Sequence, residues 1–149
     1  MTETEPGRQV VVAGIDGSPE SVAALSWAGR YAAATGATVR AVRAWHFPTA
    51  AGLPPEGRAP EAVTSEIEQR MRDEAADAIA KANVPASVPV DTVISYGHPA
   101  QVLIDESKTS SLLVVGHRGH GGFHQMLTGS VALHCVSHAA CPVVVIRGS

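Results

Sequence analysis

The sequence predicts a single α/β domain in which a parallel β-sheet is covered by helices on both faces. Two observations carry this prediction. Short, nearly unbroken apolar runs such as "QVVVAGID" (9–16) are typical of strands that are buried on both sides. These runs alternate with segments of helical periodicity, and strands separated by helices pair in parallel through right-handed crossovers. The 149 residues are enough for one domain with a substantial core, so we expect one domain over 1–149.

The first strand is followed directly by the signals of a helix start. In "GSPES", Ser18 is a candidate N-cap, Pro19 fits the first turn, and Glu20 suits the positive end of the helix. Apolar residues then recur at helical spacing as far as Gly36, which is a typical helix stop. The next run, "ATVRAVRAW" (37–45), predicts the second strand.

A long loop is predicted from His46 to Glu61, because this segment holds four prolines and two glycines and shows no periodicity. An amphipathic helix is expected from there to Asn83. The following "SVPVDTVISYG" alternates like a strand, and Pro89 within it favours an edge position. The remaining predicted elements are, in order, the helix "HPAQVLIDESK", the strand "SSLLVVG", the helix "GSVALHCVSHA" and the strand "CPVVVIR".

Composition and charge exclude several classes of function. The net charge is −3 and aromatic residues make up 4% of the chain, so the basic footprint of a nucleic-acid-binding protein is absent. No apolar run has the length of a membrane span, and the polar tail 1–8, expected to be flexible, lacks the features of a secretory signal. The two cysteines, Cys135 and Cys141, are too few for a disulfide framework, so we expect reduced thiols and a cytoplasmic location.

Candidate binding residues gather after the first and fourth predicted strands. Ligands of open α/β sheets lie beyond the carboxyl ends of strands, where the strand order reverses. The first strand ends in "GIDGS" with Asp16, and the fourth is followed by "GHRG". Gly116, Gly119 and the pair Gly129-Ser130 give the spacing G-x2-G-x9-G-S. Glycines let backbone amides approach phosphate oxygens, and the amides of a helix that opens at Ser130 would bind a phosphate with help from the helix dipole.

The histidines of this segment suggest a metal site, but the spacing argues against one. His117, His120 and His124 would share a face only on a helix, which the intervening glycines disfavour. His134 and His138 have helical i, i+4 spacing, yet no third ligand accompanies them. We therefore expect no metal site.

Catalytic interpretations of the same segment are also weak. No G-x-S-x-G sequence follows a strand, and no pattern of a cysteine nucleophile is present, so no catalytic residue is assigned. A phospho-acceptor receiver domain would need an acidic pair after the first strand, where this chain has only Asp16. Cys135 is expected to be a core thiol, with His138 partly buried on the same stripe as Val131.

The segments "VVAGIDGSPES" and "LLVVGHRGHGGFHQMLTGSVALHCVSHAACPVVVI" resemble the universal stress protein family, and the resemblance covers essentially the whole chain. The G-x2-G-x9-G-[ST] spacing resembles that of the family's ATP-binding branch. The resemblance implies an open five-stranded sheet of order 3-2-1-4-5 with four helices. It also implies an antiparallel homodimer through the last strand, Val143 to Ile146. The acid usual in the family before the fourth strand is replaced here by Ser110-Ser111, and His124 is assigned no role.

The resemblance further implies a nucleotide site. ATP, with Mg²⁺ or Mn²⁺ carried by its phosphates, would be bound by a protein that acts in stress signalling through an unknown partner, with slow hydrolysis at most. A nucleotide-dependent change at the loop 46–61 or at the dimer surface would transmit the signal. AMP or a cyclic nucleotide, a nucleotide-independent or chaperone-like role, and true ATPase or phosphotransferase activity stay open as alternatives. The implied binding residues are Gly14, Asp16, Ala44, Gly116, His117, Arg118, Gly119, His120, Gly121, Gly122, Gly129, Ser130, Val131 and Ala132.

Overall fold

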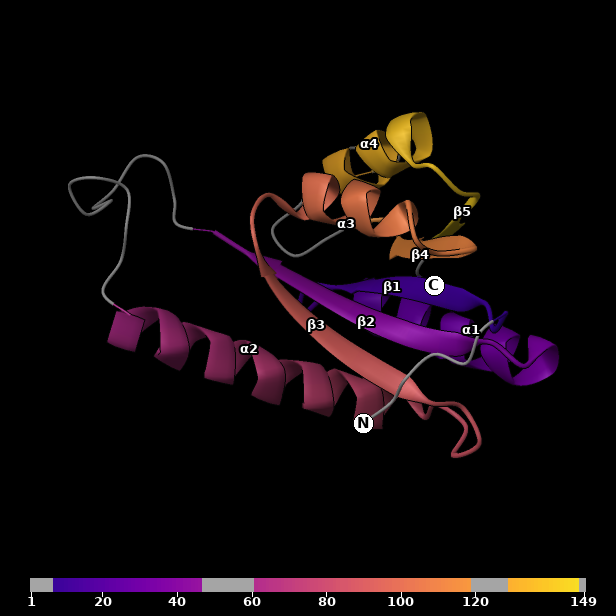
Figure 1. Cartoon of the computed structure of the whole chain (residues 1–149), viewed down its shortest axis with the longest axis horizontal. Helices are drawn as coiled ribbons and strands as arrows, with labels where there is room; N and C mark the ends of the chain where they lie inside the picture. Colours follow the sequence, from indigo (N-terminus) through magenta and orange to yellow (C-terminus); the bar gives the residue numbers. More distant parts are fainter. Residues whose placement is uncertain (1–6, 47–60, 119–128, 148–149) are drawn as a thin grey trace.

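The computed structural model describes residues 7–46, 61–118 and 129–147 (Figure 1). Strands and helices alternate throughout these ranges, in the order that the sequence predicts. The elements are β1 (Val10–Ile15), α1 (Pro19–Thr35), β2 (Thr38–Trp45), α2 (Glu61–Ala82), β3 (Val90–Tyr96), α3 (Pro99–Ser107), β4 (Leu112–Gly116), α4 (Ser130–His138) and β5 (Val143–Ile146).

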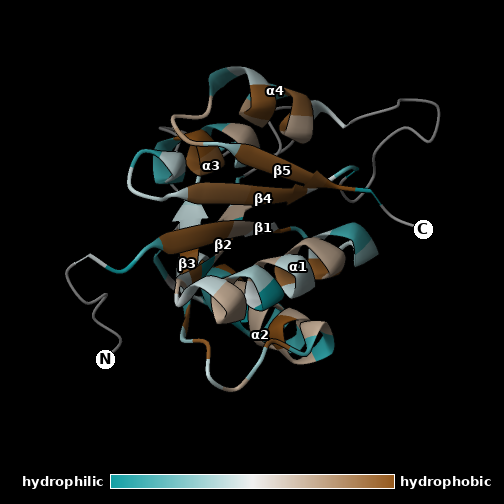
Figure 2. Ribbon diagram, turned by 90° about the vertical axis from the view of Figure 1, so that its right-hand side faces the viewer, coloured by the Kyte–Doolittle hydropathy of each residue, from teal (hydrophilic) through white to brown (hydrophobic). Residues whose placement is uncertain are grey.

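The strands form one five-stranded parallel sheet of order β3-β2-β1-β4-β5, as expected. Helices α1 and α2 cover one face and α3 and α4 cover the other (Figures 1 and 2). The sheet is built outward from the central strand β1, first through β2 and β3 on one side and then through β4 and β5 on the other. Strands β1 and β4 are therefore neighbours, although they are far apart in the sequence. Strand β3 is at an edge, and Pro89 immediately precedes it, in agreement with the prediction.

The predicted ends of α1 are confirmed. Ser18 is the N-cap, and its side-chain oxygen accepts a hydrogen bond of 3.1 Å from the amide of Ser21. Gly36 ends the helix in the left-handed conformation, with φ of 76°, and its amide donates to Ala32 O. The guanidinium of Arg8 donates to the carbonyl of Gly36 at 2.8 Å, which joins the start of the described chain to this helix end.

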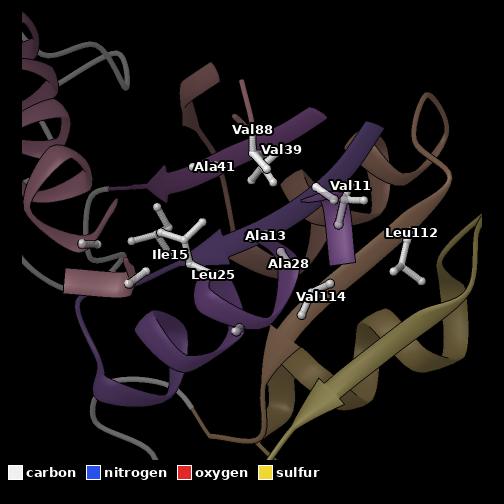
Figure 3. Close-up of a cluster of buried hydrophobic side chains, with 14 of the residues drawn as sticks. Val11, Ala13, Ile15, Leu25, Ala28, Val39, Ala41, Val88, Leu112 and Val114 are labelled. Atoms are coloured by element: carbon white, nitrogen blue, oxygen red, sulfur yellow. The ribbon is translucent and has the colours of Figure 1, made fainter. Parts of the chain in front are cut away.

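The core has two parts, one on each face of the sheet, because successive strand residues point to opposite sides. On the α1 and α2 side, Val11, Ala13 and Ile15 of β1 pack against α1, half of whose buried residues are alanines (Figure 3). On the α3 and α4 side, Val10 and Val12 pack in a cluster that includes Cys135. Small side chains on α1 bring the helix close to the sheet, so a core with few aromatic residues is still filled.

One predicted position differs from the structure. His138 is exposed, whereas the sequence analysis expected it to be partly buried. The buried stripe of α4 runs through Ala132, Cys135 and then Ala139, which lies one helical turn after Cys135. His138 is one residue short of that stripe and therefore turns toward solvent.

Some expectations fall outside the described residues. Residues 1–6, which are most of the predicted tail, and residues 47–60, which are most of the predicted loop, are not described. In the ranges that are described, no helix has both the length and the apolar composition needed to cross a membrane.

Candidate functional site

The candidate site lies at the carboxyl edge of the sheet, where β1 and β4 run side by side. The register pairs Val11 with Leu112 and Ala13 with Val114, so both strands end at the same edge. Asp16 follows β1 there, and His117 follows β4. The structure thus brings together the two strand ends that the sequence analysis singled out, at the reversal of strand order where ligands bind in open α/β sheets.

Asp16 is held in place by the turn that leads into α1. Its Oδ1 accepts hydrogen bonds from the amide of Ser18 at 2.9 Å and from the hydroxyl of Ser18. Gly17 between them has a φ of 84°, a conformation that side-chain-bearing residues rarely adopt. The carboxylate therefore has a structural role as a cap of this turn, and it is also fixed, half-buried, at the end of β1.

Two glycines assigned to the nucleotide site have packing reasons of their own. A Cβ on Gly116 would lie 2.8 Å from Glu20 Cβ and 3.0 Å from the Glu20 carbonyl carbon, so β4 touches the first turn of α1 here. A Cβ on Gly14 would lie 3.0 Å from Leu103 Cδ1 on α3. Close packing of α1 on β4 therefore restricts Gly116, whereas at Gly14 the close atoms belong to the flexible end of the Leu103 side chain.

His117 connects β4, β5 and the start of α4. Its amide donates to Ile146 O at 2.6 Å, and its carbonyl accepts a hydrogen bond of 2.7 Å from the amide of Gly129. The residue is only 7% exposed. These two bonds fix the first residues of α4 beside the end of β4, and Arg118 follows half-buried.

The amino end of α4 has the features of an anion-binding site. Gly129 is its N-cap, in an extended conformation, and provides no side chain to cap the helix. The first helical hydrogen bond runs from the amide of Leu133 to Gly129 O, at 3.0 Å. The amides of Ser130, Val131 and Ala132 therefore precede the first residue with a helical carbonyl partner. Such amides, together with the helix dipole, favour a bound phosphate or carboxylate.

The remaining predicted residues divide into two groups. Ala44 lies near the end of β2, paired with Ser95, and packs partly buried in the core on the side of α3 and α4. Its side chain is thus a core residue, and only its backbone is available to a ligand at the sheet edge. Gly119, His120, Gly121 and Gly122 lie outside the described residues.

A pocket of about 350 Å³ opens on the face of the sheet that α1 and α2 cover, between the end of β1 and α2. Its charged groups are already paired, since Arg43 contacts Glu74 at 3.3 Å and Lys81 contacts Asp77 at 2.9 Å. It shares only Asp16 with the predicted nucleotide site, so it is not the predicted phosphate cradle. The lining residues are Asp16, Gly17, Val22, Arg43, Glu74, Asp77, Ala78 and Lys81.

The sequence analysis missed one cluster at the same carboxyl edge. The imidazole rings of His46 and His98 are in contact, with centroids 4.5 Å apart. His46 directly follows β2, and His98 directly precedes Pro99 at the start of α3. A histidine at each of two strand ends was the available signal, but sequence alone does not give the register that joins them.

The two thiols are expected to differ strongly in reactivity. Burial, and after it the neighbouring Cys141, raises the pKa of Cys135 to about 11. At pH 8 this lowers the thiolate fraction of Cys135 about 100-fold relative to an ordinary thiol, and the thiolate is the reactive form. We expect a disulfide reagent at pH 8 to label Cys141 first, with Cys135 becoming reactive only as the pH approaches 11. Labelling followed by peptide mass spectrometry measures this order, and equal rates at pH 8 would contradict it.

Comparison with known proteins places this geometry in context. A sequence model described as the universal stress protein family matches residues 7–147. The universal stress protein Rv2005c of Mycobacterium tuberculosis is 38% identical over 146 residues, which is 97% of this chain and 48% of that protein. The universal stress protein MJ0531 of Methanocaldococcus jannaschii is 31% identical over 142 residues, covering 92% of this chain and 81% of the relative. The chain spans about half the length of the mycobacterial relatives it matches.

Solved structures share the fold. The universal stress protein UspA from Lactobacillus plantarum superimposes with a TM-score of 0.75 at 27% identity, covering 95% of this chain and 99% of that chain. A universal stress protein solved in complex with cAMP has a TM-score of 0.72 at 24% identity, covering 95% and 98%. A third, from Archaeoglobus fulgidus in complex with dAMP, has a TM-score of 0.60 at 21% identity, covering 93% and 97%.

Proposed function

The chain belongs to the universal stress protein family, and on that basis we propose that it binds ATP at the carboxyl edge of β1 and β4. In this proposal the phosphates lie at the amino end of α4, and the adenosine extends past Asp16 toward the end of β2. The protein acts in stress response by nucleotide-dependent binding to a partner. It works in the cytoplasm, which agrees with its two free cysteines.

The start of α4 carries this proposal. Gly129 at the N-cap provides no capping side chain, and the amides of Ser130, Val131 and Ala132 precede the first helical hydrogen bond, which supports binding of an anion there. A hydrogen bond to a charged oxygen contributes roughly 1.5–3 kcal/mol, so several amides can offset the desolvation of a phosphate. The bonds of His117 to Gly129 and Ile146 hold this site rigidly against the sheet, which supports binding without a large ordering cost.

AMP or a cyclic nucleotide is the second candidate ligand. Solved relatives bound to cAMP and to dAMP favour it, because their ligands carry a single phosphate. The same amides of α4 would hold that phosphate. The proposal for ATP rests on the G-x2-G-x9-G-S spacing from Gly116 to Ser130, which resembles that of the family's ATP-binding branch.

The test is native mass spectrometry of protein purified without added nucleotide, followed by calorimetric titration with ATP, AMP and cyclic AMP. We expect a bound adenine nucleotide, or binding of ATP in the millimolar range or tighter. Stronger binding of AMP or cyclic AMP than of ATP would select the second candidate. An empty site together with no detectable binding of any of the three would refute both.

Hydrolysis is proposed to be slow at most, so the protein is not an enzyme in the ordinary sense. Efficient attack on the terminal phosphate needs a group that orients or deprotonates water. No side chain of the described residues Gly129 to Ala132 is such a group, since Ser130 is the only polar one among them. A divalent cation, Mg²⁺ or Mn²⁺, would accompany the phosphates of ATP.

A homodimer through β5 completes the proposal. This strand, Val143–Ile146, is an edge of the sheet, and all four of its apolar residues are only partly buried. An apolar edge strand has unpaired backbone groups that a second copy can satisfy. We expect light scattering at micromolar concentration to give twice the mass of the chain, and Val145→Lys to give a monomer. A monomeric mass for the unaltered protein would contradict the dimer.

A further inference from the structure

We propose that His46 and His98 form a binding site for a divalent transition-metal cation of the Zn²⁺, Ni²⁺ or Cu²⁺ class. The proposal does not depend on nucleotide binding. The two imidazole rings meet at the carboxyl edge of β2 and β3, with centroids 4.5 Å apart and planes inclined by 48°. Both side chains are exposed, so a cation can reach them from solvent.

The backbone, not chance contact, brings the two histidines together. Trp45 and Tyr96 are register partners at the ends of β2 and β3, and their rings pack edge to face with centroids 4.9 Å apart. The amide of Gly97 donates to Trp45 O at 2.8 Å, which extends the pairing one residue further. His46 and His98 are the next residues on each segment, so the end of the sheet holds their Cα atoms in place.

The separation of the rings suits a shared metal ion. A Zn–N bond is about 2.0–2.1 Å long, so two imidazoles on one ion have centroids about 4.5 Å apart at right angles and about 5.2 Å apart in a tetrahedral arrangement. The observed 4.5 Å falls at the short end of that range. The rings are tilted and not stacked flat, so one nitrogen from each can turn toward a common point by side-chain rotation alone.

Neither ring is committed to a hydrogen bond within the described part of the chain. His98 is the N-cap of α3, but its side chain makes no capping hydrogen bond. Among residues 7–46, 61–118 and 129–147, the side chain of His46 makes no hydrogen bond either. Within these ranges, no hydrogen bond therefore competes with a cation for either ring.

A second histidine pair lies on α4 and has to be removed before binding at His46 and His98 can be measured. The rings of His134 and His138 lie 6.0 Å apart, with planes inclined by 26°. Their Nδ1 atoms lie 3.1 Å from Ser130 O and 3.2 Å from His134 O, which leaves both Nε2 atoms open. Histidines at i, i+4 on a helix can hold Zn²⁺ through such nitrogens, so this pair is a competing site.

The chemistry of the ligands selects the cation. Imidazole suits Zn²⁺, Ni²⁺ and Cu²⁺, whereas Mg²⁺ prefers oxygen ligands. Among the described residues no group of three or more ligating side chains occurs, so these residues supply two ligands, His46 and His98. The structure thus points to an exchangeable site, distinct in cation preference from any Mg²⁺ that accompanies a phosphate.

The experiment is calorimetric titration of tag-free, chelator-treated protein with NiCl₂, ZnCl₂ and MgCl₂. All variants are made in the His134→Ala/His138→Ala background, which removes the pair on α4. We expect one Zn²⁺ or Ni²⁺ site per chain in this background and no Mg²⁺ site on His46 and His98. Adding either His46→Ala or His98→Ala should lower the affinity at least about tenfold, since only one of the two imidazoles then remains.

A second measurement separates metal ligation from a change in folding. Nitrogen-detected NMR of the imidazole rings should show His46 and His98 shifting together on addition of Zn²⁺, with the backbone spectrum preserved. Absence of binding in the His134→Ala/His138→Ala background, or unchanged affinity after both His46→Ala and His98→Ala in that background, would overturn the proposal.

Discussion

Replacing Ser130 by glutamate is expected to weaken nucleotide binding strongly while leaving the protein folded. Ser130 is the exposed first residue of α4. A carboxylate there competes for the amides of the first turn and repels a phosphate. The same charge stabilises the helix by about 0.3–1 kcal/mol, because it faces the positive end of the dipole. Calorimetry should show at least about a tenfold loss of affinity, which corresponds to about 1.4 kcal/mol, for ATP and for AMP or cyclic AMP. Thermal unfolding should show an unchanged or higher Tm.

Ser137→Glu is the matched control for Ser130→Glu. Ser137 is exposed near the other end of the same helix, so the substitution adds the same charge away from the proposed phosphate site. It should leave nucleotide affinity unchanged and lower the stability slightly, because a negative charge is unfavourable near a helix carboxyl end. Ser130→Gln separates side-chain size from charge and should retain more binding than Ser130→Glu. Unaltered ATP affinity in Ser130→Glu would show that the phosphates do not lie at the start of α4.

The fold could be predicted from the sequence because its signals are local or periodic. Buried strands such as 9–16 are apolar runs, and the helices between them repeat at helical spacing. Ser18 and Gly36 act within one turn of their own positions, so their capping roles were visible in the sequence. The strand order came from the family resemblance, because no local pattern states which parallel strands are neighbours.

The candidate site could be predicted only in part, since its contacts join distant segments. The glycine spacing pointed to the start of α4, and the structure adds the bonds of His117 that hold it there. The contact of Gly116 with Glu20 depends on how closely α1 approaches β4, which the sequence does not state. The contact of His46 with His98 depends on the register of β2 and β3. The exposure of His138 was not predicted, because a shift of one residue along a helix separates a buried position from an exposed one, and the hydrophobic pattern does not define the buried side that closely.

Gly116→Ala is expected to lower the free energy of unfolding by about 2 kcal/mol, since overpacking a filled site costs about 1–3 kcal/mol. The new methyl group would lie 2.8 Å from Glu20 Cβ and 3.0 Å and 3.1 Å from the carbonyl carbon and oxygen of the same residue. Two of these are backbone atoms in the first turn of α1, so relief requires moving the helix away from the sheet. Urea denaturation measures the loss as a lower midpoint at an unchanged slope.

Gly14→Ala is the matched control for Gly116→Ala, because it adds the same methyl group at the same edge of the sheet. There the close atoms, at 3.0 Å and 3.4 Å, are the two terminal carbons of the Leu103 side chain, which can rotate aside. We expect a change below about 1 kcal/mol, partly offset by the lower entropy of the unfolded chain. Comparing the nucleotide affinity of Gly116→Ala with that of the unaltered protein then separates the roles of Gly116. If folded Gly116→Ala protein binds nucleotide normally, this first glycine of the G-x2-G-x9-G-S spacing serves helix packing. If it is as stable as the unaltered protein but does not bind, the glycine serves the ligand and the packing argument fails.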